Sequence, residues 1–472
     1  MKNNSFRTWY LVGIFAVFAG LGRAQVVQFN ANLNSAQESP ASTSGATGSA
    51  IMLYDVTANT FDLIVTINNF GNTITASHIH EGAVGVPGPV VTGLGSETVY
   101  TRNGNTLTAT FRGVTHLGSK LTLLQNGAYY NVHSTQFPGG EIRGQLIAQP
   151  VKLVALIDNA QERAAFPATA FNATAQAYGA AVMSYNPGTG AIRLRISVYN
   201  FTNTLNNSHF HEGAPGVSGG VVVNLGSSVN TTFPNGGSYS TLNGVMSGTF
   251  DIPYVGATSA VVPDPIKLLT GGAYLNFHST TFSGGETRGQ VRVSSELPSS
   301  RVINLSTRGF VGAGNQVLIE GVTVSGPDPV RLLISAKGPS LAAFGVTGAL
   351  ADPVITLYDS AGRAIATNND IGAIAPTSEL ASIPGVPTNP VESALLVVLP
   401  PGTYSAVVTG NNGATGIALL EAMDLRTLNG NLTATGVIAA APATPNARAT
   451  STAQNVIELC VGVPLAVTAV KR

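Results

Sequence analysis

Six of the seven histidines in the sequence occupy matching places in two internal repeats. In each repeat a His-x-His pair is followed, farther along the chain, by a third histidine in another shared stretch. These residues are His78, His80 and His133 in the first repeat and His209, His211 and His278 in the second. Alternate residues of a β-strand point to the same side, so each pair should present two imidazoles on one face. With the third histidine on another strand, each repeat has the donors for a copper or zinc site.

A second interpretation of the same histidines requires no metal. Buried histidines commonly donate and accept hydrogen bonds, and here they could fix loops rich in glycine and proline. The metal interpretation predicts imidazole nitrogens that converge to about 2 Å from a common point. His116, the remaining histidine, has no counterpart in the second repeat, and we expect it to be exposed in a loop.

Each third histidine is followed by an acidic and a basic residue that occur in both repeats. Glu141 and Arg143, like Glu286 and Arg288, are two residues apart, so each pair should share a strand face and could form a supporting ion pair. The preceding Gly139-Gly140 and Gly284-Gly285 are expected to be turn glycines without a phosphate-binding role.

Other catalytic patterns are absent from the sequence. It has no Gly-x-Ser-x-Gly, His-Glu-x-x-His or Walker motif, and Cys460 is its one cysteine. A disulfide within the chain and a cysteine zinc site are therefore excluded, and we expect a protein that is not an enzyme. A group at Asp359, Asn368, Asn369 and Asp370 could bind calcium weakly, although such residues usually serve β-turns.

Composition and patterning indicate an all-β protein of three antiparallel β-sandwich domains. The chain has 54 glycines and only 10% charged residues, which is typical of strands joined by many turns. Residues 50–54 and 60–67 alternate as a hairpin, residues 180–185 and 191–198 repeat it, and a short helix is expected over residues 120–126.

The expected division of the chain has five parts. We assign residues 1–24 to a signal peptide, 25–150 and 151–297 to the two repeats, 298–426 to a distinct sandwich, and 427–472 to a tail rich in Ala, Thr and Pro. The first 24 residues combine Lys2 and Arg7 with an apolar run and a small-residue cleavage site. The mature protein is expected to be extracellular, on the cell surface or periplasmic, with no membrane span after cleavage.

The shared stretches of the repeats closely resemble the chordin-type (CHRD) domain family. The first repeat carries His78-Ile79-His80-Glu81-Gly82 and a later His133…Pro138-Gly139-Gly140-Glu141-Ile142-Arg143-Gly144. In the second repeat Ser283 replaces the proline and Thr287 the isoleucine. The resemblance covers about residues 26–295 and implies an immunoglobulin-like β-sandwich in exported proteins, with a molecular role that is mostly unassigned.

Copper/zinc superoxide dismutase offers a looser resemblance. That family places copper on a His-x-His strand and a late histidine, with an arginine nearby that attracts the anionic substrate. The corresponding residues are His78, His80, His133 and Arg143, and again His209, His211, His278 and Arg288. The bridging histidine, the zinc ligands and the disulfide cysteines of the family are missing here. The third region, with Pro401-Gly402-Thr403-Tyr404, resembles a β-sandwich module of large bacterial surface proteins.

Two functions from different classes follow. The first is an exported, non-enzymatic binding or structural protein whose partner is an unknown extracellular protein or matrix ligand. The alternative is a copper-binding, superoxide dismutase-like redox protein with a three-histidine site in each repeat. Carbohydrate adhesion is a further option, but the single tryptophan lies in the signal peptide. With a net charge of zero, the sequence indicates no nucleic-acid partner.

Overall fold

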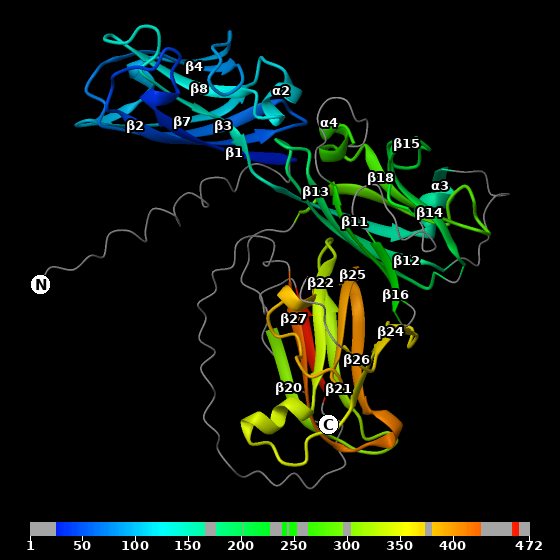
Figure 1. Ribbon diagram of the computed structural model, residues 1–472. Coiled ribbons are helices and arrows are strands. Elements are labelled where there is room, and N and C mark those ends of the chain that lie inside the picture. The colour runs from blue at the N-terminus through cyan, green and yellow to red at the C-terminus, as the bar shows by residue number, and fades with distance from the viewer. Residues whose placement is uncertain are drawn as a thin grey trace, which may run out of the picture. The chain divides into compact units, whose positions relative to one another are not determined.

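The computed structural model describes residues 25–165, 176–201, 203–226, 238–242, 245–252, 263–295, 304–372, 380–425 and 456–461. The predicted signal peptide and most of the predicted tail lie outside these ranges. The described chain is nearly all β and divides into two compact units, one built around residues 25–151 and the other around the remainder. Figure 1 colours the first repeat in blue to cyan and the second largely in green.

The first repeat is one antiparallel sheet in the order β5-β4-β8-β9-β1-β2-β3-β7-β6, with β10 paired to β1. Its strands are β1 (Val26–Asn34), β2 (Thr47–Asp55), β3 (Thr60–Asn68), β4 (Ile74–Glu81), β5 (Val90–Gly95), β6 (Thr101–Asn103), β7 (Thr106–Thr115), β8 (Ala128–Ser134), β9 (Ile142–Gln145) and β10 (Ile147–Ala148). The predicted hairpin is confirmed as β2 and β3, which pair from Asp55 opposite Thr60 to Thr47 opposite Asn68.

Short helical segments connect these strands. They are η1 (Ser35–Gln37), η2 (Glu97–Val99) and α2 (Lys120–Leu124). The predicted short helix is confirmed as α2, which begins where the side chain of Ser119 accepts a hydrogen bond from the Thr122 amide.

Alternation on β4 and β8 separates the core from the histidine face. Ile79, Tyr130 and Val132 are fully buried and pack in the core, as expected for apolar residues of a curled sheet. The register places His78 opposite Asn131 and His80 opposite Tyr129, so these four side chains share the other face.

The second repeat has the same strand order, β15-β14-β18-β19-β11-β12-β13-β17-β16. Its elements are β11 (Val151–Asp158), α3 (Asn159–Ala165), β12 (Tyr178–Tyr185), β13 (Ile192–Tyr199), β14 (Leu205–Glu212), β15 (Gly220–Asn224), β16 (Ser238–Leu242), β17 (Val245–Ile252), α4 (Pro265–Leu269), β18 (Ala273–Ser279) and β19 (Thr287–Val293). Strands β14 and β18 are the counterparts of β4 and β8, and the duplication is therefore one of fold as well as of sequence.

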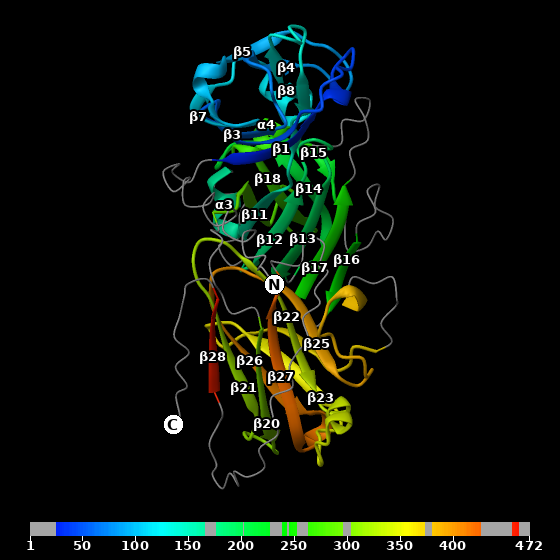
Figure 2. The ribbon, with the colours of Figure 1, turned by 90° about the vertical axis from the view of Figure 1, so that its left-hand side faces the viewer.

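The third region is a separate sandwich of two sheets, with strand orders β20-β27-β22-β25 and β24-β23-β26-β21-β28. Its elements are β20 (Asn304–Val311), β21 (Leu318–Val324), β22 (Val330–Lys337), η4 (Pro339–Phe344), β23 (Pro353–Tyr358), β24 (Ala364–Asn368), η5 (Leu380–Ser382), β25 (Ser393–Leu399), β26 (Gly402–Gly410), η6 (Asn411–Gly413), β27 (Gly416–Asp424) and β28 (Val456–Val461). Within the range predicted as a tail, β28 pairs in parallel with β21 (Figure 2).

The all-β prediction is confirmed. Side chains from both sheets of the third region, such as Ile334 of β22 and Ala406 of β26, meet in one buried cluster. Across the described ranges, no helix has the length and apolar character needed to cross a membrane.

Candidate metal centre

The three histidines of each repeat converge on one face of two paired strands. In the first repeat β4 carries His78 and His80, and the neighbouring β8 carries His133. One ring nitrogen from each lies within 4.8 Å of the other two, and the second repeat brings His209, His211 and His278 together in the same way. The structure therefore brings together all six histidines that the sequence singled out, in two sets of three.

Backbone carbonyls hold two of the three rings in the first repeat. Nδ1 of His80 lies 2.9 Å from the Gly88 oxygen, and Nδ1 of His133 lies 3.0 Å from the Pro138 oxygen. Because a carbonyl can only accept, Nδ1 carries the proton in both rings and Nε2 of the neutral imidazole keeps its lone pair. Both Nε2 atoms, together with Nδ1 of His78, are buried without a hydrogen-bond partner among the described residues.

The second repeat reproduces this arrangement. Nδ1 of His211 lies 2.9 Å from the Gly219 oxygen and Nδ1 of His278 lies 2.9 Å from the Ser283 oxygen. Nδ1 of His209 is 3.1 Å from Nε2 of His278. Two donors at this separation can both lie about 2.0–2.1 Å from one ion.

These nitrogens fit a transition metal. A buried polar atom left without a partner costs about 1–3 kcal/mol, and a metal ion would supply the missing interaction. A set made of imidazoles suits copper or zinc, whereas calcium and magnesium require oxygen ligands.

The electrostatics of the cluster favour neutral rings. Burial, and next the neighbouring imidazoles, lowers the pKa of His78 below its usual value, and the same two causes lower the pKa of His209 to about 4. Burial also lowers the pKa of His80, His211 and His278. Neutral imidazole is the form that binds a metal.

The predicted ion pairs between the supporting residues are not what the structure shows. The Glu141 carboxylate accepts hydrogen bonds from Ser44 and Asn72, and that of Glu286 accepts one from Asn203. Glu141 precedes β9 instead of lying on it, so strand alternation does not place its side chain beside that of Arg143. The glutamates tie neighbouring loops together.

Arg143 and Arg288 instead lie over tyrosine rings beside the histidines. The Arg143 guanidinium carbon is 4.3 Å from the centroid of the Tyr129 ring, and the Arg288 carbon is 3.6 Å from that of Tyr274. The two arginines are only 3% and 1% exposed, which separates their charge from solvent.

Sequence reasoning missed one buried acid in each repeat, Glu38 and Glu162. Each is the last residue of an Ala-Gln-Glu tripeptide, and the recurrence of this tripeptide in both repeats was the signal available in the sequence. Burial raises the pKa of both carboxyls to about 7, although Arg143 or Arg288 acts in the opposite direction. The carboxylate oxygens of Glu38 lie against Gly140, and those of Glu162 against Gly285.

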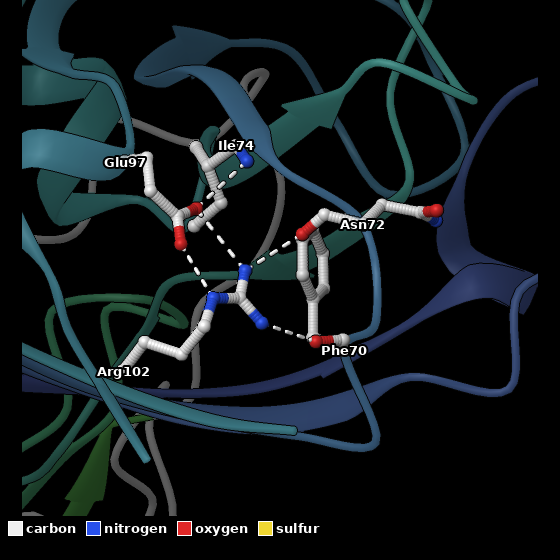
Figure 3. Close-up of polar contacts among 5 residues, drawn as sticks. All are labelled: Phe70, Asn72, Ile74, Glu97 and Arg102. Atoms are coloured by element: carbon white, nitrogen blue, oxygen red, sulfur yellow. Dashed lines mark hydrogen bonds and ion pairs between the residues drawn. The ribbon is translucent and has the colours of Figure 1, made fainter. Parts of the chain in front are cut away.

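An ion pair anchors the chain just before β4 in the first repeat (Figure 3). Arg102 Nε lies 2.5 Å from a Glu97 oxygen, while its other nitrogens donate to the carbonyls of Phe70 and Asn72 at 2.7 Å. The second Glu97 oxygen accepts from the Ile74 amide at 2.9 Å. The first residue of the strand that carries His78 and His80 is therefore fixed from β6 and η2.

Two sequence expectations need correction or refinement. His116 was expected to be exposed, but it is 1% exposed because its ring packs edge-on against Tyr54 with centroids 5.9 Å apart. Asp359 accepts hydrogen bonds from its own turn and pairs with Arg363, and the Asn369 side chain donates to Asp370. These contacts agree with a role in β-turns, which was the alternative to calcium binding expected from the sequence.

A comparison with protein families identifies the repeats. The family model of the CHRD domain matches residues 29–146 and 154–291, together just over half of the chain. Both segments lie within the boundaries predicted for the repeats, and each contains its three histidines. No curated protein matches the chain.

Proposed function

Because the chain belongs to the CHRD-domain family and carries the domain twice, we propose that it is an exported, non-enzymatic protein that binds one copper ion in each CHRD domain. The ligands are His78, His80 and His133 in the first domain. In the second they are His209, His211 and His278. Copper is favoured over zinc because it forms the more stable complexes with a given set of nitrogen donors.

The observation that carries this proposal is the set of ring nitrogens in the first domain. His78 Nδ1, His80 Nε2 and His133 Nε2 are all buried and all lack a hydrogen-bond partner among the described residues, and one ring nitrogen of each histidine lies within 4.8 Å of the other two. If these histidines served only to hold loops, Nδ1 of His80 and of His133 would do so, and their other nitrogens would not need to converge.

The same geometry favours binding over redox catalysis. In the resemblance to superoxide dismutase, an arginine attracts an anionic substrate. Here Arg288 donates to the carbonyls of Val217 and Ala214 and to Gln290, and it is 1% exposed. An arginine so engaged has no free face for an anion from solvent.

Export, and a partner outside the cell, are part of the proposal. The basic residues, apolar run and small residues within 1–24 support a signal peptide. An extracellular protein or matrix ligand is the partner that an exported binding protein of this kind would meet.

The test is the metal content of the mature protein after copper loading and exhaustive dialysis, measured by elemental analysis. We expect two equivalents of copper, one after His80→Gln or His211→Gln, and none in the double variant. A parallel loading with zinc, followed by competition, should leave copper bound.

The matched control is His116→Gln, which removes a buried histidine outside both clusters and should keep two equivalents. Thermal unfolding establishes that each variant is folded. A folded wild-type protein that retains neither metal would sink the proposal, as would a double variant that still holds two equivalents.

A further inference from the structure

A tyrosine ring stacks on one ligand histidine in each domain. The rings of Tyr129 and His80 are 4.9 Å apart with an interplanar angle of 10°, and those of Tyr274 and His211 are 4.9 Å apart at 12°. The arginine described above lies over the same tyrosine. Arginine, tyrosine and histidine therefore form one contact series, which recurs in the second domain.

The same three side chains hold one short loop segment. In the first domain Arg143 donates to the Val86 oxygen at 3.4 Å, the Gly88 amide donates to the Tyr129 hydroxyl at 3.1 Å, and the Gly88 oxygen accepts from His80. Residues 86–88 are thus bound from three sides.

The second domain repeats each of these contacts. Arg288 donates to the Val217 oxygen at 3.1 Å and the Gly219 amide donates to the Tyr274 hydroxyl at 3.0 Å. The Gly219 oxygen again meets Nδ1 of His211. The two loops differ in sequence at Val84 and Pro215, so the shared contacts do not depend on identical loops.

We propose that Arg143 with Tyr129, and Arg288 with Tyr274, are positioning residues that set the ring plane and tautomer of His80 and His211. The inference rests on the proposed copper binding and assigns these residues a role in its affinity. The loop carbonyl keeps the proton on Nδ1, and the stacked tyrosine keeps the ring from rotating, so Nε2 stays directed into the cluster. Contacts of this kind behind a ligand typically change metal affinity by about 10–100-fold.

Arginine suits this position for a physical reason. Its planar guanidinium stacks on an aromatic face and still donates hydrogen bonds at its edge, whereas a lysine ammonium has no planar face to stack on the ring. The contacts to the Val217 and Ala214 carbonyls compensate for the burial of the Arg288 charge.

The test measures one site at a time. In a His211→Gln background, which silences the second domain, the copper affinity of the first domain is compared with that of Arg143→Met and of Tyr129→Leu. We expect each change to weaken binding by about 10–100-fold and to alter the electron paramagnetic resonance spectrum of bound Cu(II). Tyr129→Phe keeps the stacked ring and loses only the hydrogen bond with the Gly88 amide, so it should bind copper more tightly than Tyr129→Leu and nearly as tightly as the parent.

Arg112→Met is the matched control. It removes an ion pair with Asp62 in the same domain, but Arg112 lies on β7, which pairs with β3 and β6 and not with β4 or β8. It should lower the thermal midpoint without changing the copper affinity. An Arg143→Met variant that only loses stability, and binds copper as tightly as its parent, would show that the stack is structural.

A second measurement needs no metal. Long-range ¹⁵N–¹H spectra of the metal-free protein report which ring nitrogen of His80 is protonated. We expect the Nδ1–H form in the parent and a mixture of tautomers in Tyr129→Leu. Unchanged tautomers would overturn the inference even if copper binding fails, whereas a parent that binds no copper contradicts the proposed function alone.

Discussion

In the first domain, Nδ1 of His80 and of His133 lies against a backbone carbonyl, while Nε2 of each ring is buried without a hydrogen-bond partner among the described residues. Strand alternation predicted that His78 and His80 share a face, and that prediction is confirmed. The assignment of Nδ1 of His80 to the Gly88 carbonyl was not predictable, because it depends on the path of an eight-residue loop and on a ring torsion. Sequence patterns report the side of a strand but not the rotation of a ring.

The buried acids were missed for a related reason. Glu38 follows the 3-10 turn η1, where no periodic pattern indicates which side chain turns inward. Its carboxylate packs against Gly140, about 100 residues away in the sequence. Only the repetition of Ala-Gln-Glu could have indicated it.

We predict that Glu38 makes the first domain less stable as the pH rises. Burial raises the pKa of this carboxyl from 4.5 to about 7, so between these values the folded state binds a proton that the unfolded state has lost. The contribution of this carboxyl to the free energy of unfolding is therefore greatest below pH 4.5, falls as the pH rises from 4.5 to about 7, and is constant above that. The Glu38→Gln variant should lose this dependence.

Differential scanning calorimetry measures the unfolding transition of the first domain at pH 5 and at pH 8, in the wild type and in Glu38→Gln. Glu162→Gln provides the same comparison in the second domain, where burial again raises the pKa to about 7. A wild-type profile between these pH values that matches the Glu38→Gln profile would contradict the prediction.

At the scale of the elements, the sequence predicted the strands better than their irregularities. The hairpins and the short helix were located correctly because alternation and turn residues are local signals. The pairing of β4 with β5 shifts register between Ile79 and His80, and β14 with β15 shifts between Phe210 and His211. Such bulges redirect a side chain, and their position depends on the partner strand.

The loop that joins β8 to β9 gives a prediction from two adjacent glycines. A Cβ at Gly140 would lie 2.7 Å from a Glu38 oxygen, and its φ of +132° disfavours any other residue. A Cβ at Gly139 would meet nothing within 4 Å. We expect Gly140→Ala to destabilise the first domain by about 1–3 kcal/mol, and Gly139→Ala to have little effect.

Thermal unfolding of the two variants side by side measures this difference. Gly284→Ala and Gly285→Ala repeat the experiment in the second domain, where Gly285 has a φ of +130°. Equal midpoints for Gly139→Ala and Gly140→Ala would show that the contact with the buried carboxyl is not a constraint.

At the scale of the whole molecule, the two repeats differ at one position that has different surroundings in each: Asn68 in the first repeat and Tyr199 in the second. Tyr199 is fully buried within the core cluster of the third sandwich, and its hydroxyl donates to the Val398 oxygen at 2.8 Å. The Val398 amide donates to Ser197 at 2.9 Å. In the first domain Asn68 occupies the matching place, just before Asn69-Phe70, and is exposed.

We expect Tyr199→Asn, which introduces the residue of the first domain, to loosen the second domain from the third sandwich. Loss of a buried aromatic ring typically costs about 3–5 kcal/mol. Calorimetry should show the joint transition of this unit splitting or moving to lower temperature, while Asn68→Ala leaves the profile unchanged. A Tyr199→Asn protein with the wild-type profile would mean that the contact contributes nothing to stability.

The glycine of the histidine loop has a consequence for how the gene can change. A Cβ at Gly88 would lie 1.5 Å from the backbone carbonyl oxygen of Glu81, and one at Gly219 would lie 1.6 Å from the backbone carbonyl oxygen of Glu212. Every amino-acid change reached from a glycine codon by a single base substitution adds a Cβ. Substitution at this codon is therefore disfavoured in each copy, even though other positions of the same stretch differ between the copies, such as Ile79 and Phe210 or Val84 and Pro215. As the two halves of the gene diverge, we expect this glycine to be retained while other positions change.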